Sequence, residues 1–272
     1  MRLLYCGDVM GKPGREAVLT HVPQLRRDLN LDFVVACGEN AAHGFGITAA
    51  ICQEFYSAGV DVITLGNHAW DQREIISYIS AEPRLLRPLN YPPEAPGRGF
   101  GLYTTAKGRR VMVVQVMCRL FMDSLDDPFR ALDGCLEHHP LRDAADAIIV
   151  DVHGEASSEK GALGHISDGR ASMVVGSHSH IPTADTRIMP GGTAFQSDAG
   201  MCGPFDSVIG MKKHTATQRF VTKMPTERLE PADGEGTLCG VYVETDDRTG
   251  LALRAEPVRV GGVLKQAVPG AL

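Results

Sequence analysis

Short, continuously apolar runs alternate with segments of helical spacing through the first half of the chain. Three such runs, typical of buried strands in length and β-branched content, cover residues 2–8, 32–40 and 60–67. Between them, apolar residues recur at helical spacing in segments 15–30 and 47–59, and Pro23 is expected to kink or divide the first of these helices. This strand–helix–strand order predicts a parallel sheet with right-handed crossovers.

The second half continues with strands and then changes to hairpins. A helix is predicted around residues 128–139, and further strands within residues 101–108, 109–117, 145–156 and 171–182. From residue 185 onward, paired short apolar runs with glycine turns predict antiparallel hairpins, most clearly at 244–253. Residues 85–99 contain four prolines and no periodicity, so we expect a loop there and consider it as a linker between domains.

Polar residues stand at the points where the predicted strands end. They are Asp8, Glu39, Asn40, Asn67, His68, His153, His178 and His180. Parallel strands place their carboxyl ends at one edge of a sheet, which is where open α/β sheets bind ligands. We therefore expect these side chains to form one site.

The loop that begins at Asp8 is open to three interpretations: a phosphate-binding loop, a helix cap or a metal ligand. A Walker loop is excluded, because only three residues separate Gly7 from Gly11 and Pro13 stands where the hydroxyl residue is needed. A cap is disfavoured, because residues 12–14 separate Asp8 from the expected start of the helix. The other strand-end residues favour a metal ligand.

The donor types indicate which metals suit this site. Carboxylate, amide oxygen and imidazole groups together suit iron, manganese or zinc better than calcium, which binds oxygen ligands. The spacing of His178 and His180 predicts both imidazoles on one face of an extended segment. Glu39 has two carboxylate oxygens and can bridge two ions.

Composition restricts the partners. The 27 basic and 33 acidic residues give a formal charge of −6, so we expect no stable nucleic-acid complex and no membrane binding. We find no signal-peptide core and no apolar run that approaches a membrane span. Seven cysteines without a CxxC pair favour reduced thiols in a cytoplasmic protein. The sequence leaves a homo-oligomer open.

Several segments together resemble the calcineurin-like metallophosphoesterase superfamily. They are GNHAWD (66–71), His153 after an apolar strand, and GSHSHIPTAD (176–185). The segments GDVMGKPGR, GENAAHGFG, DVHGEASSEK and DAGMCGPFDSVIGM resemble its YmdB-like branch. Met10 stands where the superfamily usually has a histidine, and Glu39 where it usually has an aspartate. Both departures are shared by the YmdB-like branch.

The resemblance implies a fold, two metal ions and their ligands. It implies a four-layer α/β/β/α sandwich of two facing mixed sheets with outer helices. The expected metals are iron or manganese, with zinc as the alternative. One ion would be held by Asp8, Glu39, Asn40 and His180, and the second by Glu39, Asn67, His153 and His178. These ligands come from both sides of segment 85–99, so we expect residues 1–272 to form a single domain.

The resemblance also implies an activity. It indicates a phosphodiesterase that hydrolyses small phosphodiesters, above all 2′,3′-cyclic nucleotides, by attack of a metal-bridged hydroxide with His68 as proton donor. Three questions stay open: whether the same site acts on phosphomonoesters, whether the protein is a non-catalytic nucleotide-binding regulator, and whether His43 contacts the substrate.

Overall fold

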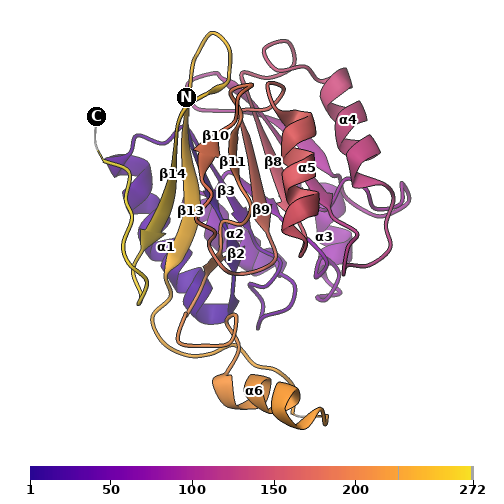
Figure 1. The fold of residues 1–272 in the computed structure, drawn as a ribbon, viewed down its shortest axis with the longest axis vertical. Coiled ribbons are helices and arrows are strands. Elements are labelled where there is room, and N and C mark those ends of the chain that lie inside the picture. Colours follow the sequence, from indigo (N-terminus) through magenta and orange to yellow (C-terminus); the bar gives the residue numbers. More distant parts are fainter. Residues whose placement is uncertain (226, 271–272) are drawn as a thin grey trace.

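Two six-stranded mixed sheets face each other and are covered by helices on their outer sides (Figure 1). This computed structural model describes residues 1–225 and 227–270. One apolar cluster joins Tyr5 and Val35 of the first sheet to Val113 and Ile149 of the second, so the sheets share an inner core. The predicted four-layer α/β/β/α sandwich is confirmed.

The first sheet is parallel along four strands and ends in an antiparallel hairpin. Its order is β14 (Ala252–Val260), β13 (Leu238–Thr245), β1 (Arg2–Cys6), β3 (Phe33–Cys37), β4 (Val62–Thr64) and β5 (Leu85–Leu86). Strand β13 pairs antiparallel with both β1 and β14. The connecting helices are α1 (Gly11–Asp28), α2 (Ala49–Ser57) and α3 (Ile75–Ala81).

The second sheet has a parallel centre and antiparallel edges. Its order is β10 (Arg187–Ile188), β11 (Ala194–Gln196), β9 (Met173–Ser177), β8 (Ala147–His153), β7 (Arg110–Met117) and β6 (Phe100–Thr104). Helices α4 (Pro128–His138) and α5 (Ser157–Ser167) pack on its outer face. A small sheet pairs β2 (Asp8–Val9) with β12 (Met201–Cys202), and α6 (Lys213–Thr222) lies apart from the sandwich at its lower end (Figure 1).

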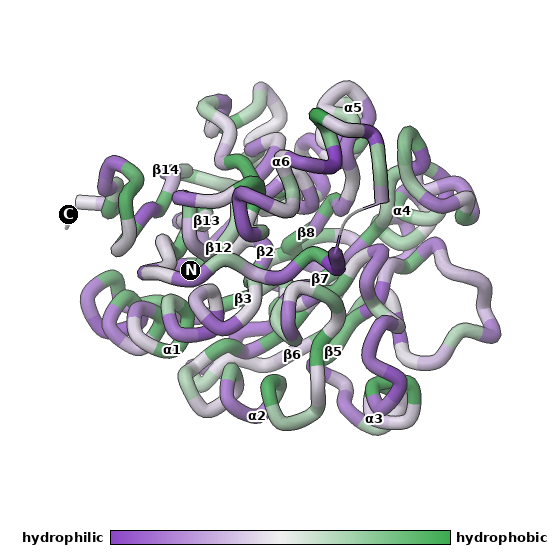
Figure 2. The backbone as a smooth tube through the Cα atoms, turned by 90° about the horizontal axis from the view of Figure 1, so that it is seen from below, coloured by the Kyte–Doolittle hydropathy of each residue, from purple (hydrophilic) through white to green (hydrophobic). Residues whose placement is uncertain are grey.

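Strands buried on both faces explain the continuous apolar runs in the sequence. In β1, Leu3 and Tyr5 belong to the core between the sheets, whereas Leu4 and Cys6 belong to the core under the helices. Successive side chains of a strand point to opposite faces, so both sets must be apolar. Figure 2 shows the resulting hydrophobic colour along the central strands β7 and β8.

Helix α1 differs from its prediction at the start and at Pro23. It begins at Gly11, with Met10 as an N-cap that makes no side-chain hydrogen bond, and it continues through Pro23. Pro13 is tolerated because the first turn of a helix needs no backbone N–H partners there. Asp8 is therefore not the cap, although the helix begins closer to Asp8 than expected.

Segment 85–99 contacts both sheets. It starts with strand β5, which the sequence did not predict, and β5 pairs with β4 of the first sheet. Farther along, the Leu89 N–H donates to the Gln115 carbonyl, and the Asn90 amide donates to the Met117 carbonyl, both in β7 of the second sheet. In the part of the chain that the structure describes, no helix is long and apolar enough to cross a membrane.

Candidate metal centre

The seven predicted metal ligands meet at the carboxyl ends of parallel strands from both sheets. Asp8, Glu39, Asn40 and Asn67 follow strands β1, β3 and β4 of the first sheet, and all offer oxygen atoms. His153 ends β8, and His178 and His180 follow β9, so the second sheet offers the nitrogen atoms.

His153 is the centre of one group of ligands. Its Nε2 atom lies 2.9 Å from the Asn67 Oδ1 atom and 3.2 Å from the Glu39 Oε1 atom. The His178 Nδ1 atom is 3.2 Å from the same nitrogen. These are the four side chains that the resemblance assigns to the second ion, and the structure brings all of them together.

The side chains of the other predicted group lie beside the first. The His180 Nε2 atom is 3.3 Å from the Asn40 Oδ1 atom. Asp8 is fully buried, and one of its oxygens clusters with the Cys37 sulfur and a ring nitrogen of His153 within 4.8 Å of one another. Glu39 belongs to the cluster around His153 and is the candidate bridge between the groups.

The hydrogen-bond network leaves lone pairs facing each other, which fits a bound cation. Ser177 donates its hydroxyl proton to Asp151 at 2.7 Å, so it must accept a hydrogen bond from the Nδ1–H of His153 at 2.9 Å. When His153 is neutral in this tautomer, its Nε2 lone pair is directed at the oxygens of Asn67 and Glu39. Without a cation, burial opposes protonation of His153, but Glu39 outweighs it and raises the pKa of His153 to about 9, so a proton on Nε2 then lies between these donor atoms. A divalent cation in place of this proton would bind all three donor atoms.

The same reasoning applies to His180. Its Nδ1 atom lies 2.8 Å from the Ile209 carbonyl and must donate to it. The amide nitrogen of Asn40 donates to the Gly44 carbonyl at 3.0 Å, which turns its Oδ1 atom toward the His180 ring. When the His180 ring is neutral, two electron-pair donors face each other across 3.3 Å. Both groups of side chains fit a divalent ion.

The backbone of the His178–His180 segment is not extended. His178 has φ 98° and His180 has φ 66°, so the prediction of two imidazoles on one face of an extended segment is wrong. Hydrogen bonds hold this unusual backbone: the His178 N–H donates to Asp8 at 3.0 Å, and the Ser179 N–H donates to Asp198 at 3.0 Å. The imidazoles point in different directions, each toward one group of ligands.

Gly66 is required by the close approach of two candidate ligands. A Cβ atom at this position would lie 2.4 Å from both the Glu39 Oε2 and the His153 Nε2 atoms. Because the site needs this space, any other residue at position 66 would displace one of the two side chains.

Burial and neighbouring charges shift the pKa values of the candidate ligands. Burial lowers the pKa of His178 to about 3, and the His153 ring adds to the effect, so His178 is neutral and can donate a lone pair. Burial alone would raise the pKa of Glu39, but His153 outweighs it and lowers this pKa to about 2. Burial raises the pKa of Asp8 in the absence of a cation.

His68 lies at the border of the site. Its side chain is 27% exposed, and its Nδ1 atom is 2.8 Å from the Asp71 carboxylate. Its backbone N–H donates to Glu39 Oε2 at 2.9 Å. The His68 and Phe45 rings pack edge to face, with their centroids 5.2 Å apart. These contacts fix the ring and leave the Nε2 atom without a protein partner among the described residues.

The sequence analysis missed the residues that support the ligands. Ser177 and Asp151 orient His153, and Lys160 donates to Asp198 at 2.7 Å and to the Ser177 carbonyl at 2.8 Å. Asp151 stands two residues before His153 on the same strand, so a period of two was an available signal for it. Lys160 lies in a helix and carries no such signal.

Met10 and His43 occupy contrasting positions. Met10 is fully buried in an apolar cluster with Met201 and Met211. The position at which the superfamily usually has a histidine therefore contributes to packing in this chain.

His43 is exposed in the wall of a cavity of about 580 Å³ that also includes Asp71. Contact of His43 with a substrate stays a prediction.

Relatives of similar length resemble this chain in sequence along almost all of it. The family model described as YmdB-like protein matches residues 4–258. The chain is 44% identical over 260 residues to a 2′,3′-cyclic-nucleotide 2′-phosphodiesterase of Bacillus subtilis (strain 168), with 96% of this chain and 97% of that protein covered. A protein of Mycoplasma pneumoniae, provisionally named a phosphatase/phosphodiesterase, is 32% identical over 267 residues, with coverage of 96% and 93%.

Two crystal structures are similar throughout. A hypothetical protein from Thermus thermophilus superimposes with a TM-score of 0.89 at 42% identity and covers 97% of this chain and 100% of that one. A Mycoplasma pneumoniae phosphatase superimposes with a TM-score of 0.88 at 32% identity, with coverage of 96% and 93%. From the match over residues 4–258 and the identity to these relatives, the chain belongs to the YmdB-like protein family of the metallophosphoesterase superfamily.

Proposed function

We propose that this protein is a metal-dependent phosphodiesterase whose favoured substrates are 2′,3′-cyclic nucleotides. The observation that carries the proposal is the pair of donor-atom clusters around His153 and His180, which fit two divalent ions. The name of the Bacillus subtilis relative supports the substrate class and the bond, because a 2′-phosphodiesterase opens the cyclic phosphate at the 2′ oxygen and leaves a 3′-nucleotide.

In this proposal the side chains would hold two ions. Asp8, Glu39, Asn40 and His180 would hold one ion, and Glu39, Asn67, His153 and His178 would hold the other, so Glu39 belongs to both sets. When bound, such ions supply positive charge for phosphate oxygens and make a water molecule nucleophilic near neutral pH. Two divalent ions against the carboxylates of Asp8 and Glu39 leave a positive centre, which attracts a substrate anion even though the whole chain carries a charge of −6.

His68 is proposed to hold the proton that the leaving oxygen receives. Asp71 orients the ring through its Nδ1 atom at 2.8 Å, so the Nε2 atom is the one that can carry the proton toward the substrate. Support comes from the position of His68 directly after Asn67, a ligand candidate, and from its backbone N–H, which donates to Glu39, another ligand candidate.

A phosphomonoester is the second candidate substrate. It is favoured by the Mycoplasma pneumoniae structure, which is described as a phosphatase. Comparing the turnover of 2′,3′-cyclic AMP with that of 3′-AMP separates the two. A diesterase converts the first into the second and stops there, whereas a monoesterase releases inorganic phosphate from 3′-AMP.

We also propose that residues 1–272 act as one domain. The ligand candidates span Asp8 to His180, and segment 85–99 hydrogen-bonds to β7 after leaving β5. Neither half of the chain contains a complete set of ligands for either ion.

The experiment that tests the function combines metal analysis with a substrate panel. Protein purified without a tag is analysed for iron, manganese and zinc, stripped with chelator, reloaded and assayed on 2′,3′-cyclic AMP and bis-p-nitrophenyl phosphate. We expect hydrolysis that disappears with the metal and returns on reloading. A metal-loaded protein that leaves both diesters intact would refute the proposal.

A further inference from the structure

A cavity of about 550 Å³ opens beside His68 and has no assigned role. Its lining includes Phe45, Asp71, Gln72, Arg219 and Arg228. Asp71 belongs to its wall and is also the hydrogen-bond partner of His68, so the cavity and the candidate metal centre are neighbours. Its volume falls in the range of small-molecule sites, about 300–1,000 Å³.

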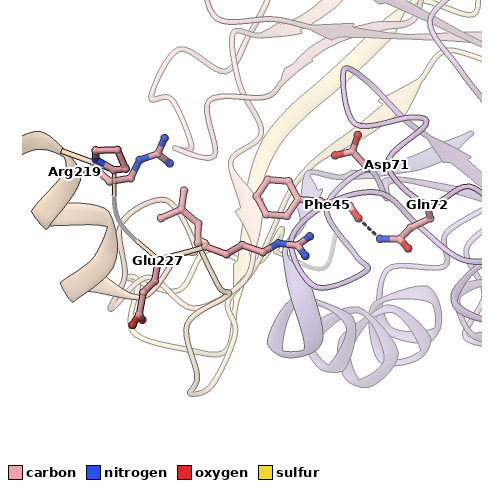
Figure 3. Close-up of a pocket in the computed structure, with 8 residues that line it drawn as sticks. Phe45, Asp71, Gln72, Arg219 and Glu227 are labelled. Carbon is pink, nitrogen blue, oxygen red and sulfur yellow. Dashed lines mark hydrogen bonds between the residues drawn. The ribbon is translucent and has the colours of Figure 1, made fainter. Parts of the chain in front are cut away.

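Two segments far apart in the sequence form opposite walls. Figure 3 shows Arg219 of α6 on one side, Asp71 and Gln72 on the other, and the Phe45 ring between them. The 580 Å³ cavity that includes His43 shares Asp71, Gln72 and Arg228 with this one. The two cavities therefore adjoin each other, and the partner of His68, Asp71, belongs to the wall of both.

Contacts to Gln72 and His68 hold the Phe45 side chain in place, and its ring offers a flat surface to the cavity. The Gln72 amide donates to the Phe45 carbonyl at 2.8 Å, and the His68 ring meets the Phe45 ring nearly at a right angle (76°). These contacts fix both the backbone and the ring of Phe45. A fixed aromatic side chain in a pocket provides a stacking surface at little cost in conformational entropy.

Arg228 stands over this surface without being packed against it. Its Cζ atom is 6.0 Å from the centroid of the Phe45 ring. A planar group between them needs two stacking contacts of about 3.5–4.0 Å each, or about 7–8 Å in all. The guanidinium must therefore move outward by about 1–2 Å to admit such a group, and both the ring and the guanidinium stack well on aromatic rings.

We propose that this cavity binds the nucleobase of the substrate, which stacks on Phe45 with Arg228 on its other face. The inference rests on the proposed function, because it takes the phosphate to lie at the metal centre next to His68. The Phe45 ring is in contact with the His68 ring, and a nucleotide spans the short path from phosphate to base. The pocket makes the protein prefer nucleoside cyclic phosphates to cyclic phosphates without a base.

The test compares two substrates that differ only in the base: 2′,3′-cyclic AMP and methyl riboside 2′,3′-cyclic phosphate. In F45A, we expect the ratio of the two KM values to move against the nucleotide by roughly 5- to 150-fold, the range that base–aromatic stacking supports. F45W keeps a stacking surface and is expected to keep the preference. The control R248A removes an arginine whose side chain is 89% exposed in the β13–β14 turn and should leave the ratio unchanged.

An unchanged ratio in F45A, or an equal rise of KM for both substrates, would overturn the base subsite. A separate calorimetric titration with 3′-AMP and with inorganic phosphate measures binding without turnover. We expect F45A to weaken 3′-AMP alone, and equal affinities in wild type and F45A would also overturn the subsite. Should the wild type hydrolyse neither cyclic phosphate, the proposed function fails, and the titration still decides whether the pocket binds a base.

Discussion

His153 shows at the level of single residues how a buried imidazole is prepared for a cation. Its Nδ1–H is committed to Ser177, which is in turn committed to Asp151, and Gln115 donates to the other Asp151 oxygen at 3.1 Å. Such outer hydrogen bonds fix the tautomer of a ligand, and their loss typically costs about 10- to 100-fold in metal affinity.

Replacing His68 with alanine tests the proposed proton donor. We expect kcat on 2′,3′-cyclic AMP to fall by about 10²- to 10⁴-fold, because the leaving oxygen then receives its proton from water. The metal content should stay at the wild-type value, since His68 is not among the proposed ligands. The measurement is steady-state kinetics together with elemental analysis of the same sample.

The conservative variant D71N is the companion to H68A. It keeps an oxygen acceptor for the His68 Nδ1 atom, so its kcat should lie between those of the wild type and H68A. Unchanged kcat in H68A would contradict the role of His68, and loss of metal in H68A would show that the residue supports the ions instead.

The ligand candidates could be found from the sequence because each stands at the end of an apolar run. Strand polarity then places them at one edge without any knowledge of packing. Lys160 and Ser177 could not be found in this way. The role of Lys160 depends on Asp198, 38 residues away, and the role of Ser177 depends on Asp151, 26 residues away. In addition, a lysine in a helix ordinarily faces solvent.

Among the elements, the turn after β9 depends most on support from outside itself. Asp198 accepts hydrogen bonds from the Ser179 and Gly200 N–H groups, and Lys160 of α5 neutralises it. The Lys160 and Asp198 side chains are only 3% and 2% exposed. Burial would raise the pKa of Asp198, but Lys160 outweighs it and the pKa lies below its usual value.

Removing Lys160 should destabilise the fold in a pH-dependent way. In K160M, Asp198 is left buried without its cation, and we expect the free energy of unfolding to fall by about 3–5 kcal/mol at pH 7. The lowered pKa of Asp198 in the wild type means that its contribution is present above the unfolded pKa and is lost as the pH falls. In the variant, protonation relieves the buried charge, so the difference between the proteins should shrink from about pH 7 to about pH 4.

Urea unfolding of both proteins at several pH values measures this difference. The control K213M breaks an exposed ion pair with Asp206, whose side chains are 61% and 78% exposed, and should change stability by at most ~1 kcal/mol. A difference between K160M and wild type that is small, or constant with pH, would show that the Asp198 carboxylate does not need Lys160.

The type of an element, helix or strand, was predictable where its apolar pattern extended over many residues. The residues at which elements begin and end were not predictable. Strands β1, β3 and β4 of the first sheet and the β13–β14 hairpin follow from their apolar patterns, whereas the two-residue strand β5 does not. Helix α6 was missed, because its apolar residues Phe220 and Val221 are exposed and form no buried stripe. The path of α1 through Pro23 depends on packing of Val18 and Val22 against the sheet, which local propensity does not contain.

Over the whole molecule, the candidate centre lies where the two sheets meet, so metal binding should stabilise the sandwich. With Mn²⁺ at about 100 times its dissociation constant, linkage gives ~2.7 kcal/mol. For a chain of this size we expect a rise in Tm of about 5–10 °C over chelator-treated protein. Differential scanning calorimetry with and without Mn²⁺ measures it. H178A should lose the part of this rise that the second ion contributes, and an equal rise in H178A would contradict the assignment of His178.

The four-layer arrangement could be predicted because alternating strands and helices, followed by hairpins, match a known architecture. The cavity beside Phe45 could not. It exists only because α6 and the chain that follows it return beneath the carboxyl ends of the strands (Figure 1). No local pattern in residues 213–222 indicates that position.

The separation of donor atoms between the sheets has a consequence for evolution. The proposed oxygen ligands come from the first sheet and the proposed nitrogen ligands from the second, so exchanging residues in one half alone would tune the hardness of the centre. A His178→Asp change would then favour Mn²⁺ or Mg²⁺ over Zn²⁺ without altering Glu39, the proposed bridge. Lineages exposed to different metal supplies can thus diverge in ion preference while keeping the same reaction geometry.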